Sequence, residues 1–295
     1  MDTIRDILSS RLGGRWNAQP LEASGFCNTW RAEGQQGALF VKSVPTASAA
    51  MLLAEADGLQ SLAATQAVRV PQTAGCWIDG HQAVLALEWL HFKPADADFG
   101  ERFGHALAAL HTARPAEGGG RYGWRRDNML GGTPQRNVWS SEPGLAGWIE
   151  FFGRERLGAM RERLQADDTP AQLIEAVDAV IAALPGFFTA DGHEPRACLI
   201  HGDLWSGNWG MLADGTPVIY DPAVSCSDAE AELAMMELFG SPSSDFWQAY
   251  REAAPLASGY EQRRGVYQLY HLLNHALLFG GNYLQQSLSL ARKLV

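Results

Sequence analysis

A short stretch of strand-forming residues, glycines and acidic side chains interrupts the otherwise helical second half of this 295-residue chain. It runs from Cys198 to Pro222 and contains Asp203, Asn208 and, at the end of an apolar strand, Asp221. A loop between two short strands places Asp203, Asn208 and Asp221 on one side of a small sheet. Carboxylate and amide oxygens are ligands that suit Mg²⁺, and a further carboxylate can accept a hydroxyl proton. These are the groups that phosphoryl transfer from ATP requires.

The spacing of His201, Asp203 and Asn208 matches the H-x-D-x-x-x-x-N pattern of kinase catalytic loops, with Gly202 where arginine is usual. Any one Asp or Asn in a glycine-rich turn is more often a turn former than a catalytic group. The three polar residues together, with strands before and after them, favour the catalytic interpretation.

The first part of the chain offers a cation. Lys42 lies inside the predicted strand 39–44, and a helix is predicted from an N-cap at Thr46 to about Ala63. Glu55 lies on or beside the apolar stripe of this helix, where a buried carboxylate needs a partner. Lys42 and Glu55 therefore fit the ion pair that orients the phosphates in kinases. Taken alone, a lysine in a strand is as readily an edge residue.

A loop at 24–28 is the candidate for covering phosphates. It joins predicted strands at 20–23 and 29–32, and it contains one glycine, Gly25. Backbone N–H groups in such a hairpin can cap phosphates, but a plain β-turn fits these residues equally well. Cys27 in this loop is expected near Lys42, which would lower the pKa of its thiol and let oxidation block ATP. The alternative is an inert small residue in a turn.

The pattern of the whole chain predicts an α+β fold with two lobes, 1–91 and 92–295, connected near 88–94. Further strands are predicted at 69–71 and 83–89 in the first lobe. The second lobe is predicted to be mainly helical. Its helices are expected from about Phe99, over 171–184 with a stop at Pro185, and over 260–294 with a break at Gly280.

Composition narrows the possible partners. The chain carries 23 Lys and Arg against 33 Asp and Glu, a net charge of −10, which argues against nucleic acid as the main partner. No signal-like N-terminus and no membrane span are evident, since the richest apolar run, 83–90, is short and contains Glu88. The four cysteines are scattered, as expected of reduced thiols. We expect a cytoplasmic protein that is a monomer or a weak homodimer.

Several segments together resemble the fructosamine kinase (ketosamine 3-kinase) family, within the protein-kinase-like superfamily that includes aminoglycoside and choline phosphotransferases. The resemblance extends from about residue 20 to 285. The residues that carry it are Phe40-Val-Lys42, 54–59, 68–71, 87–90, 107–111, Gly123-Trp124, Asp127-Asn128, Pro134-Gln135, Asn137, 201–210, Asp221-Pro-Ala-Val224, 237–240 and 267–275.

The resemblance implies a bilobal protein-kinase-like fold, with a small β-rich N-lobe that holds one key helix and a larger, mainly helical C-lobe. It implies Asp203 as the catalytic base, Asn208 and Asp221 as Mg²⁺ ligands, and Lys42 with Glu55 as the pair that orients ATP. Glu88, Trp89 and Leu90 would form the hinge that meets adenine. The implied reaction phosphorylates the 3-hydroxyl of a ketosamine, free or protein-bound. The unstable product then loses its sugar, which amounts to deglycation.

The chain departs from the family pattern at the phosphate loop, which is usually richer in Gly and Ser, and after Val224, where aromatics and an arginine are frequent. Candidate substrate contacts each have a structural alternative. Trp205 could stack on a sugar or pack in the core. Asp127 and Asn128 could touch substrate or cap a loop. A set on one helical face could line a polyol pocket or be satisfied core groups: His271, Asn274 and His275.

Two other functions remain open from sequence. One is a phosphotransferase for another hydroxyl, such as that of an aminoglycoside or choline, since polycationic acceptors suit an acidic protein. The other is a kinase-like binding protein without catalysis, which the joint presence of Lys42, Asp203, Asn208 and Asp221 disfavours.

Overall fold

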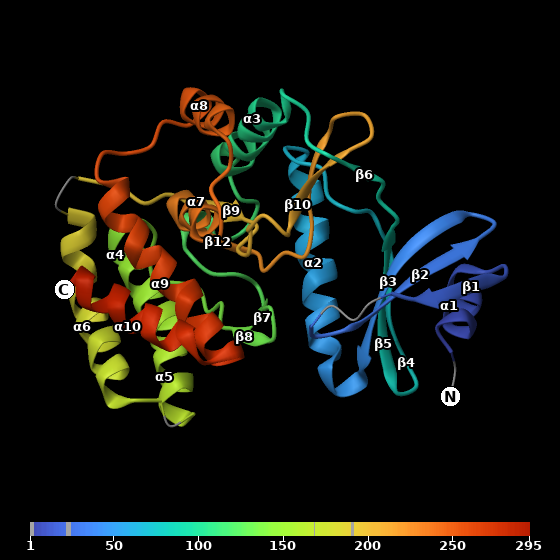
Figure 1. The fold of residues 1–295 in the computed structure, drawn as a ribbon, viewed down its shortest axis with the longest axis horizontal. Coiled ribbons are helices and arrows are strands. Elements are labelled where there is room, and N and C mark those ends of the chain that lie inside the picture. The colour runs from blue at the N-terminus through green and yellow to red at the C-terminus, as the bar shows by residue number, and fades with distance from the viewer. Residues whose placement is uncertain (1–2, 22–24, 168, 190–191) are drawn as a thin grey trace.

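The computed structural model describes residues 3–21, 25–167, 169–189 and 192–295. The end of the predicted first hairpin strand at Ala23 and the start of the phosphate loop at Ser24 lie outside the described residues. The rest forms two lobes, a small sheet-rich one and a larger helical one (Figure 1).

The small lobe is a five-stranded antiparallel sheet in the order β1-β2-β3-β5-β4. The helix α1 (Ile4–Leu12) packs Ile7 and Leu8 against Trp16 and Val41 of this sheet. Residues of β5 alternate between two cores, since Val84 and Ala86 face α1 while Leu85 and Leu87 face the other side. The strands are β1 (Trp16–Pro20), β2 (Asn28–Gly34), β3 (Gly37–Pro45), β4 (Thr73–Asp79) and β5 (Gln82–Glu88).

The helix α2 (Ala49–Thr65) lies between the sheet and the helical lobe (Figure 1). Its buried leucines share one apolar core with residues of both lobes, among them Leu85 of the sheet and Leu107 and Val224 of the larger lobe. Because this core is continuous, the position of α2 depends on the packing of both lobes.

The larger lobe carries short β elements at the face toward the small lobe. A three-stranded sheet has the order β11-β10-β6, and two further pairs are β12 with β9 and β7 with β8. Asp203, Asn208 and Asp221 all lie in the loops around these strands. The strands are β6 (Phe92–Lys93), β7 (Asn128–Leu130), β8 (Thr133–Gln135), β9 (Ala197–Ile200), β10 (Trp209–Leu212), β11 (Pro217–Ile219) and β12 (Ser225–Asp228).

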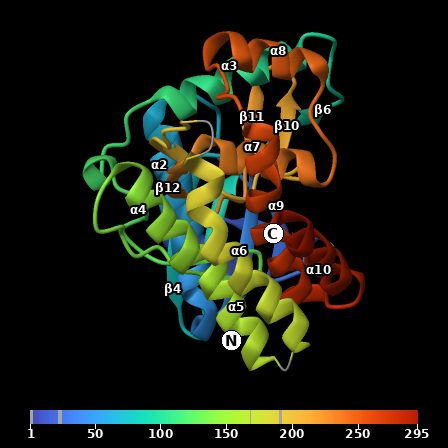
Figure 2. The same ribbon diagram turned by 90° about the vertical axis from the view of Figure 1, so that its left-hand side faces the viewer.

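Helices form the remainder of this lobe, and those farthest from the small lobe lie nearest the viewer in Figure 2. Tyr122, Trp148, Phe152 and Tyr267 pack at its centre. A π-helical segment, Phe152–Gly158, joins α4 to α5. The helices are α3 (Phe99–Thr112), α4 (Gly144–Phe151), α5 (Ala159–Ala166), α6 (Ala171–Thr189), α7 (Ala229–Leu238), α8 (Ser244–Ala253), α9 (Tyr260–Phe279) and α10 (Asn282–Leu294).

The structure confirms the predicted strands at 39–44 and 83–89, the helix at Phe99 and the break at Gly280. The predicted stop at Pro185 is wrong, because α6 continues through Pro185 to Thr189. Proline removes one N–H and one helical hydrogen bond, and packing of Leu184 and Phe188 on either side of it compensates. By length and composition α6 could also cross a membrane, but here it packs on α5, α9 and α10.

Three local predictions were also wrong. The segment at 69–71 forms only one bridge, from Arg69 to Val218, in place of a strand. The first hairpin strand begins at Trp16 and ends at Pro20, four residues earlier than predicted at its start. Thr46 begins a 3₁₀ turn and bonds Gly80, while α2 itself begins at Ala49 after an N-cap at Ser48. Propensity and turn chemistry fix element boundaries loosely, which explains these shifts.

Candidate active site

Lys42 is buried at the interior strand β3, with 5% of its surface exposed. Its Nζ lies 2.7 Å from Glu55 Oε1 on α2 and 2.7 Å from Asp221 Oδ1 after β11. The predicted Lys42–Glu55 pair is therefore present. One ammonium group joins the sheet, α2 and the larger lobe.

Burial alone would lower the pKa of Lys42, but the carboxylates of Glu55 and Asp221 outweigh it and raise that pKa, so the ammonium stays charged. Burial also raises the pKa of Glu55, although the charge of Lys42 opposes the rise. The ammonium of Lys42 stabilises the charged form of Glu55, and removal of either partner would leave a buried charge without a counter-ion.

The catalytic loop, residues 201–208, follows β9. His201 is buried, and its Nε2 donates to the Tyr220 carbonyl at 2.8 Å while its Nδ1 accepts the Asp203 N–H at 3.3 Å. Burial lowers the pKa of His201, which agrees with a neutral ring that donates from one nitrogen and accepts at the other. The Ala223 N–H donates to the His201 carbonyl at 2.8 Å. The loop and the segment after Asp221 are thus bound together.

The backbone at Gly202 leaves no room for the arginine that is usual at this position of kinase catalytic loops. Its φ is +85°, and a Cβ there would lie 2.1 Å from the Ala223 carbonyl oxygen. A side chain at this position would collide with backbone, so only glycine lets the two segments approach this closely.

Glu232 of α7 supports the catalytic loop from below. It is 1% exposed, and its Oε1 accepts the Gly202 N–H at 2.7 Å. His111 of α3 lies between Glu232 Oε2, at 2.9 Å from Nε2, and the Tyr250 hydroxyl, at 2.8 Å from Nδ1. Burial would raise the pKa of Glu232, but the hydrogen bond and charge of His111, the charge of His201 and the hydrogen bond from the Gly202 N–H lower that pKa. No local pattern in the sequence marks Glu232 or His111 as part of the site.

Asp203 lies at the floor of the cleft, where its carboxylate accepts no hydrogen bond from the described residues. Burial, followed by repulsion from Asp221 and Glu232, raises the pKa of Asp203 to about 7. A carboxylate with a pKa near neutrality is suited to accept a proton from an attacking hydroxyl.

Asn208 and Asp221 face Asp203 across the cleft floor. The Asn208 amide nitrogen donates to the Asp203 carbonyl at 2.7 Å, which leaves the amide oxygen as its available acceptor. Asp221 has a left-handed backbone (φ +61°) and a half-exposed side chain. Its carboxylate thus projects into the cleft while Pro222, Ala223 and Val224 are buried behind it. An amide oxygen and a carboxylate are donors that fit Mg²⁺.

The cleft between the lobes has a volume of about 320 Å³. The Phe26 ring lies against the Gly131–Gly132 turn and Leu278, so the predicted phosphate loop rests on the larger lobe. Seven of the predicted site residues line the cleft: Gly25, Lys42, Glu55, Asp203, Trp205, Asn208 and Asp221. Asn128, a candidate substrate contact from sequence, lines the cleft as well, and lining residues that sequence did not assign to it include Met51, Ala54 and Met129. Cys27 also lines it.

The predicted hinge, 88–90, connects the lobes but does not line this cleft. The Glu88 carboxylate pairs with Arg69 and accepts the Gln72 N–H, and the Trp89 ring lies near Phe40 and under Arg31. Contact of Glu88, Trp89 or Leu90 with adenine therefore stays a prediction.

Four predicted substrate contacts do not line the cleft. The Asp127 carboxylate accepts the Asn137 N–H at 2.8 Å, which is its loop-capping alternative. His271 and Asn274 are buried, and burial lowers the pKa of His271 to about 3. His275 packs among aromatic rings, Phe239 and Tyr283 among them. His271 and Asn274 are turned toward the core beside β7 and β8, which spacing along a helix does not reveal.

Comparison with known proteins adds the family. The model of the fructosamine kinase family matches residues 2–295. The chain belongs to this family. It is 40% identical over 267 residues to a probable ketoamine kinase of Synechocystis sp., with 89% of this chain and 83% of that protein covered. It is 36% identical to a chloroplastic protein-ribulosamine 3-kinase of Arabidopsis thaliana, with 86% and 75% covered.

Solved structures agree with the α+β, protein-kinase-like fold expected from sequence. A fructosamine-3-kinase structure from Thermobifida fusca is 33% identical, with a TM-score of 0.84 and coverage of 100% of this chain and 99% of that one. A choline kinase from Streptococcus pneumoniae is 14% identical, with a TM-score of 0.67 and 98% of each chain covered. At that identity the second likeness concerns the fold alone.

Proposed function

We propose that this chain transfers the γ-phosphoryl group of ATP to the 3-hydroxyl of a ketosamine, the adduct of a sugar with an amine. The observation that carries the proposal is that Lys42, Asp203, Asn208 and Asp221 line one cleft, although they come from both lobes. Membership of the fructosamine kinase family supports the same reaction. Relatives named ketoamine kinase and protein-ribulosamine 3-kinase support the substrate class.

Lys42 supplies the positive charge that ATP phosphates need in a protein of net charge −10. Glu55 holds the ammonium in place at 2.7 Å and prevents it from turning away from the cleft. Nucleotide entry would draw Lys42 Nζ from Asp221 toward phosphate oxygens while the bond to Glu55 remains. The bond between Lys42 and Asp221 therefore belongs to the nucleotide-free state.

The Asn208 amide oxygen and the Asp221 carboxylate would hold Mg²⁺. The metal would neutralise charge on the phosphates. These residues fit Mg²⁺ because they offer two oxygen ligands. The Asn208 amide nitrogen donates to the Asp203 carbonyl, so the amide oxygen is available, and the Asp221 carboxylate projects into the cleft. Lys42 pairs with only one oxygen of Asp221, Oδ1.

Asp203 would accept the proton of the attacking hydroxyl. The acceptor oxygen forms a bond to the γ-phosphorus, the bond to the β-γ bridging oxygen breaks and ADP leaves. The hydroxyl proton passes to the Asp203 carboxylate. Positioning and charge stabilisation supply most of the catalysis in such a transfer, and the base supplies a smaller share.

Trp205 is proposed to contact the sugar. It is two residues after Asp203, its side chain is exposed to 40%, and it lines the cleft with Met129 and Phe26. An exposed indole beside a catalytic carboxylate offers a flat apolar face on which a sugar can stack.

A panel of acceptors tests this function. The purified chain is incubated with ATP and Mg²⁺ and with ribulosamine, erythrulosamine and fructosamine adducts, beside an aminoglycoside and choline. We expect phosphate transfer to at least one ketosamine and none to the other acceptors. Transfer only to the aminoglycoside or choline would favour the alternative phosphotransferase. ATP that stays intact with every acceptor would contradict the proposal.

A further inference from the structure

The helix α2 carries Glu55, but its own ends do little to fix its rotation. Its N-cap, Ser48, makes no side-chain hydrogen bond, and its first turn has no acidic residue. Residues in a helix advance by about 100°, so Glu55 and Asp57 point to nearly opposite sides. Glu55 faces Lys42 of the small lobe. Asp57 faces the larger lobe.

Both oxygens of Asp57 are bound by the larger lobe. Oδ2 accepts the Trp124 Nε1–H at 3.0 Å, and Oδ1 accepts Arg125 Nε at 3.0 Å and Nη2 at 2.7 Å. The Asp57 side chain is 11% exposed and the Arg125 side chain 35%, so the carboxylate is shielded while the guanidinium still meets water. The paired Nε and Nη2 donors of Arg125 make this a charge-assisted contact of fixed geometry.

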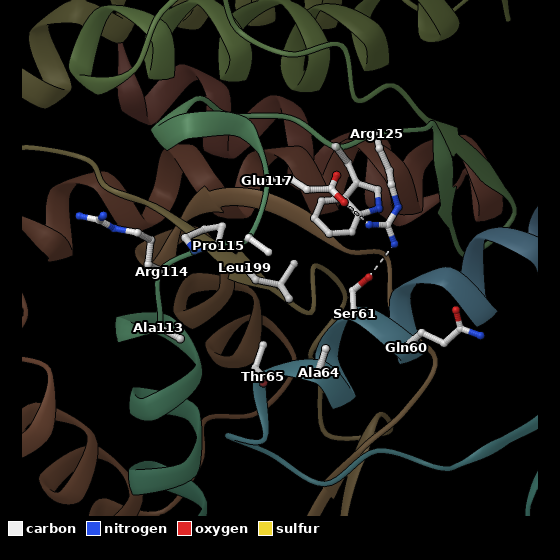
Figure 3. Close-up of a pocket in the computed structure, with 12 residues that line it drawn as sticks. Gln60, Ser61, Ala64, Thr65, Ala113, Arg114, Pro115, Glu117, Arg125 and Leu199 are labelled. Carbon is white, nitrogen blue, oxygen red and sulfur yellow. Dashed lines mark hydrogen bonds and ion pairs between the residues drawn. The ribbon is translucent and has the colours of Figure 1, made fainter.

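Arg125 extends the contact along the helix. Its Nη2 also donates to Ser61 Oγ at 2.9 Å, one turn beyond Asp57, and its Nη1 donates to Glu117 at 2.5 Å (Figure 3). The guanidinium carbon lies 4.8 Å from the centre of the Trp124 ring. Two points one turn apart fix the rotation of a helix, which a single contact would not do.

The same part of α2 rests on the segment that follows Asp221. A Cβ at Gly58 would lie 3.2 Å from Pro222 and 3.3 Å from Val224, so the helix backbone packs directly against this segment. The clamp of Asp57, Trp124 and Arg125 therefore presses α2 onto the segment that carries one proposed metal ligand. Glu55 and Asp221 then meet at Lys42 on the cleft side.

We propose that Asp57 and Arg125 are positioning residues for phosphoryl transfer. Through the clamp they set the rotation of α2 and so present Glu55 to Lys42. This inference rests on the function proposed above, because it assigns the clamp to nucleotide alignment. None of the three clamp residues needs to touch substrate, and Asp57 and Arg125 are not among the residues that line the cleft.

A pocket of about 490 Å³ borders the clamp on its outer side (Figure 3). Arg114 lines this pocket with Arg125 but forms no ion pair with any residue that the structure describes. Arg114→Gln thus makes the same change of charge beside the same pocket without breaking a contact to α2. It is the matched control for Arg125→Gln.

The test is a double-mutant cycle on kcat/KM for ATP with a ketosamine acceptor. Arg125→Gln is made in the wild-type chain and in Glu55→Gln, with Asp57→Asn as a second break of the clamp. We expect Arg125→Gln to lower kcat/KM about 10-fold or more in the wild type and less than about 2-fold in Glu55→Gln, since both act through one pair. Arg125→Lys should restore part of the loss, and Arg114→Gln should change little.

Amide hydrogen exchange supplies a readout that needs no activity. Arg125→Gln and Asp57→Asn should speed exchange in the second half of α2 (57–65), while Arg114→Gln leaves it unchanged. Equal losses of kcat/KM in both backgrounds, or unchanged activity with faster exchange, would overturn the positioning role and leave the clamp a structural contact. A wild-type chain without ketosamine turnover would instead overturn the proposed function, whatever the exchange shows.

Discussion

Lys42 Nζ lies 2.7 Å from Asp221 Oδ1, although the two residues are 179 positions apart in the chain. The same Nζ lies 2.7 Å from Glu55 Oε1. A single buried ammonium on the sheet therefore contacts α2 and the loop after β11 at once. Both contacts of Lys42 can form only when the two lobes are packed as the structure shows.

Lys42→Met tests this pair. Methionine keeps much of the volume of the side chain but leaves the Glu55 carboxylate buried without its cation, and breaking a buried pair in this way costs about 3–5 kcal/mol. We expect KM for ATP to rise about 10-fold or more and Tm to fall. Burial raises the pKa of Glu55, so at pH 5.5 it takes up a proton and the Tm loss should be smaller than at pH 8.

The double variant Lys42→Met/Glu55→Gln is the control for stability, because it removes the stranded charge. Its Tm at pH 8 should lie closer to that of the wild type than the Tm of Lys42→Met does. A Tm loss in Lys42→Met that is the same at both pH values would show that the buried carboxylate is not its cause.

Asp203→Asn tests the base. The amide keeps the shape of the side chain but cannot accept the hydroxyl proton, so we expect kcat to fall by about three orders of magnitude or more while ATP still binds. Turnover and nucleotide binding are measured on the same preparation. Near-normal kcat would show that another group takes the proton.

Stability distinguishes loss of the base from loss of folding. The pKa of Asp203 is raised above its unfolded value, so its contribution to stability is complete below the unfolded pKa and is lost as pH rises through about 7. Asp203→Asn should therefore raise Tm by about 2–4 °C at pH 8 and change it little at pH 4. A lower Tm at pH 8 would point to damaged folding.

The pH dependence of kcat/KM tests the role of Glu232. Asp203 must be deprotonated to act, so activity should fall as pH drops through about 7. Glu232→Gln keeps an oxygen for the Gly202 N–H but removes a charge that helps to raise the pKa of Asp203. The acidic limb of the kcat/KM profile should therefore move to lower pH.

The control is Glu237→Gln, on the same helix but paired with Arg264 and Tyr260, which should leave the acidic limb in place. A limb that Glu232→Gln does not move would separate Glu232 from the acidity of Asp203.

His193 tests electrostatics outside the cleft. Its Nε2 lies 2.7 Å from Asp228 Oδ2, at the N-terminus of α7. Burial opposes the charged ring, but the hydrogen bond and charge of Asp228, with the charge of Glu230, raise the pKa of His193. The stability that it supplies is complete below its unfolded pKa and is lost as pH rises through the folded pKa.

His193→Gln should accordingly lower Tm more at pH 5.5 than at pH 8. Thermal unfolding of both proteins at the two pH values measures the difference. A larger loss at pH 8 would reverse the sign and contradict a raised pKa.

Sequence predicted the core of the site because its chemistry is local. The spacing of Asp203 and Asn208 and the strand before Asp221 place these groups on one loop system, and a stripe of apolar residues around Glu55 requires a partner for its carboxylate. All of them, with Lys42, line the cleft. The α+β class follows in the same way from the change of periodicity along the chain.

Contacts between distant segments could not be predicted. Nothing local distinguishes Asp57 from an exposed helix residue, and its partners Trp124 and Arg125 lie 67 and 68 positions away. The face of α9 that bears His271 is polar enough to suggest a pocket, yet tertiary packing turns it toward the core. Pro185 shows the same limit, because the packing of α6 outweighs a local helix-breaking signal.

The position of the transferred phosphate tests the central claim most directly. A ketosamine is incubated with ATP, Mg²⁺ and the wild-type chain, and the product is analysed by phosphorus–proton correlation NMR, with Asp203→Asn in parallel. The account predicts a phosphorus signal that couples to the proton on C3 of the sugar in the wild type and none in Asp203→Asn. Phosphate on another carbon, or equal product from Asp203→Asn, would contradict it.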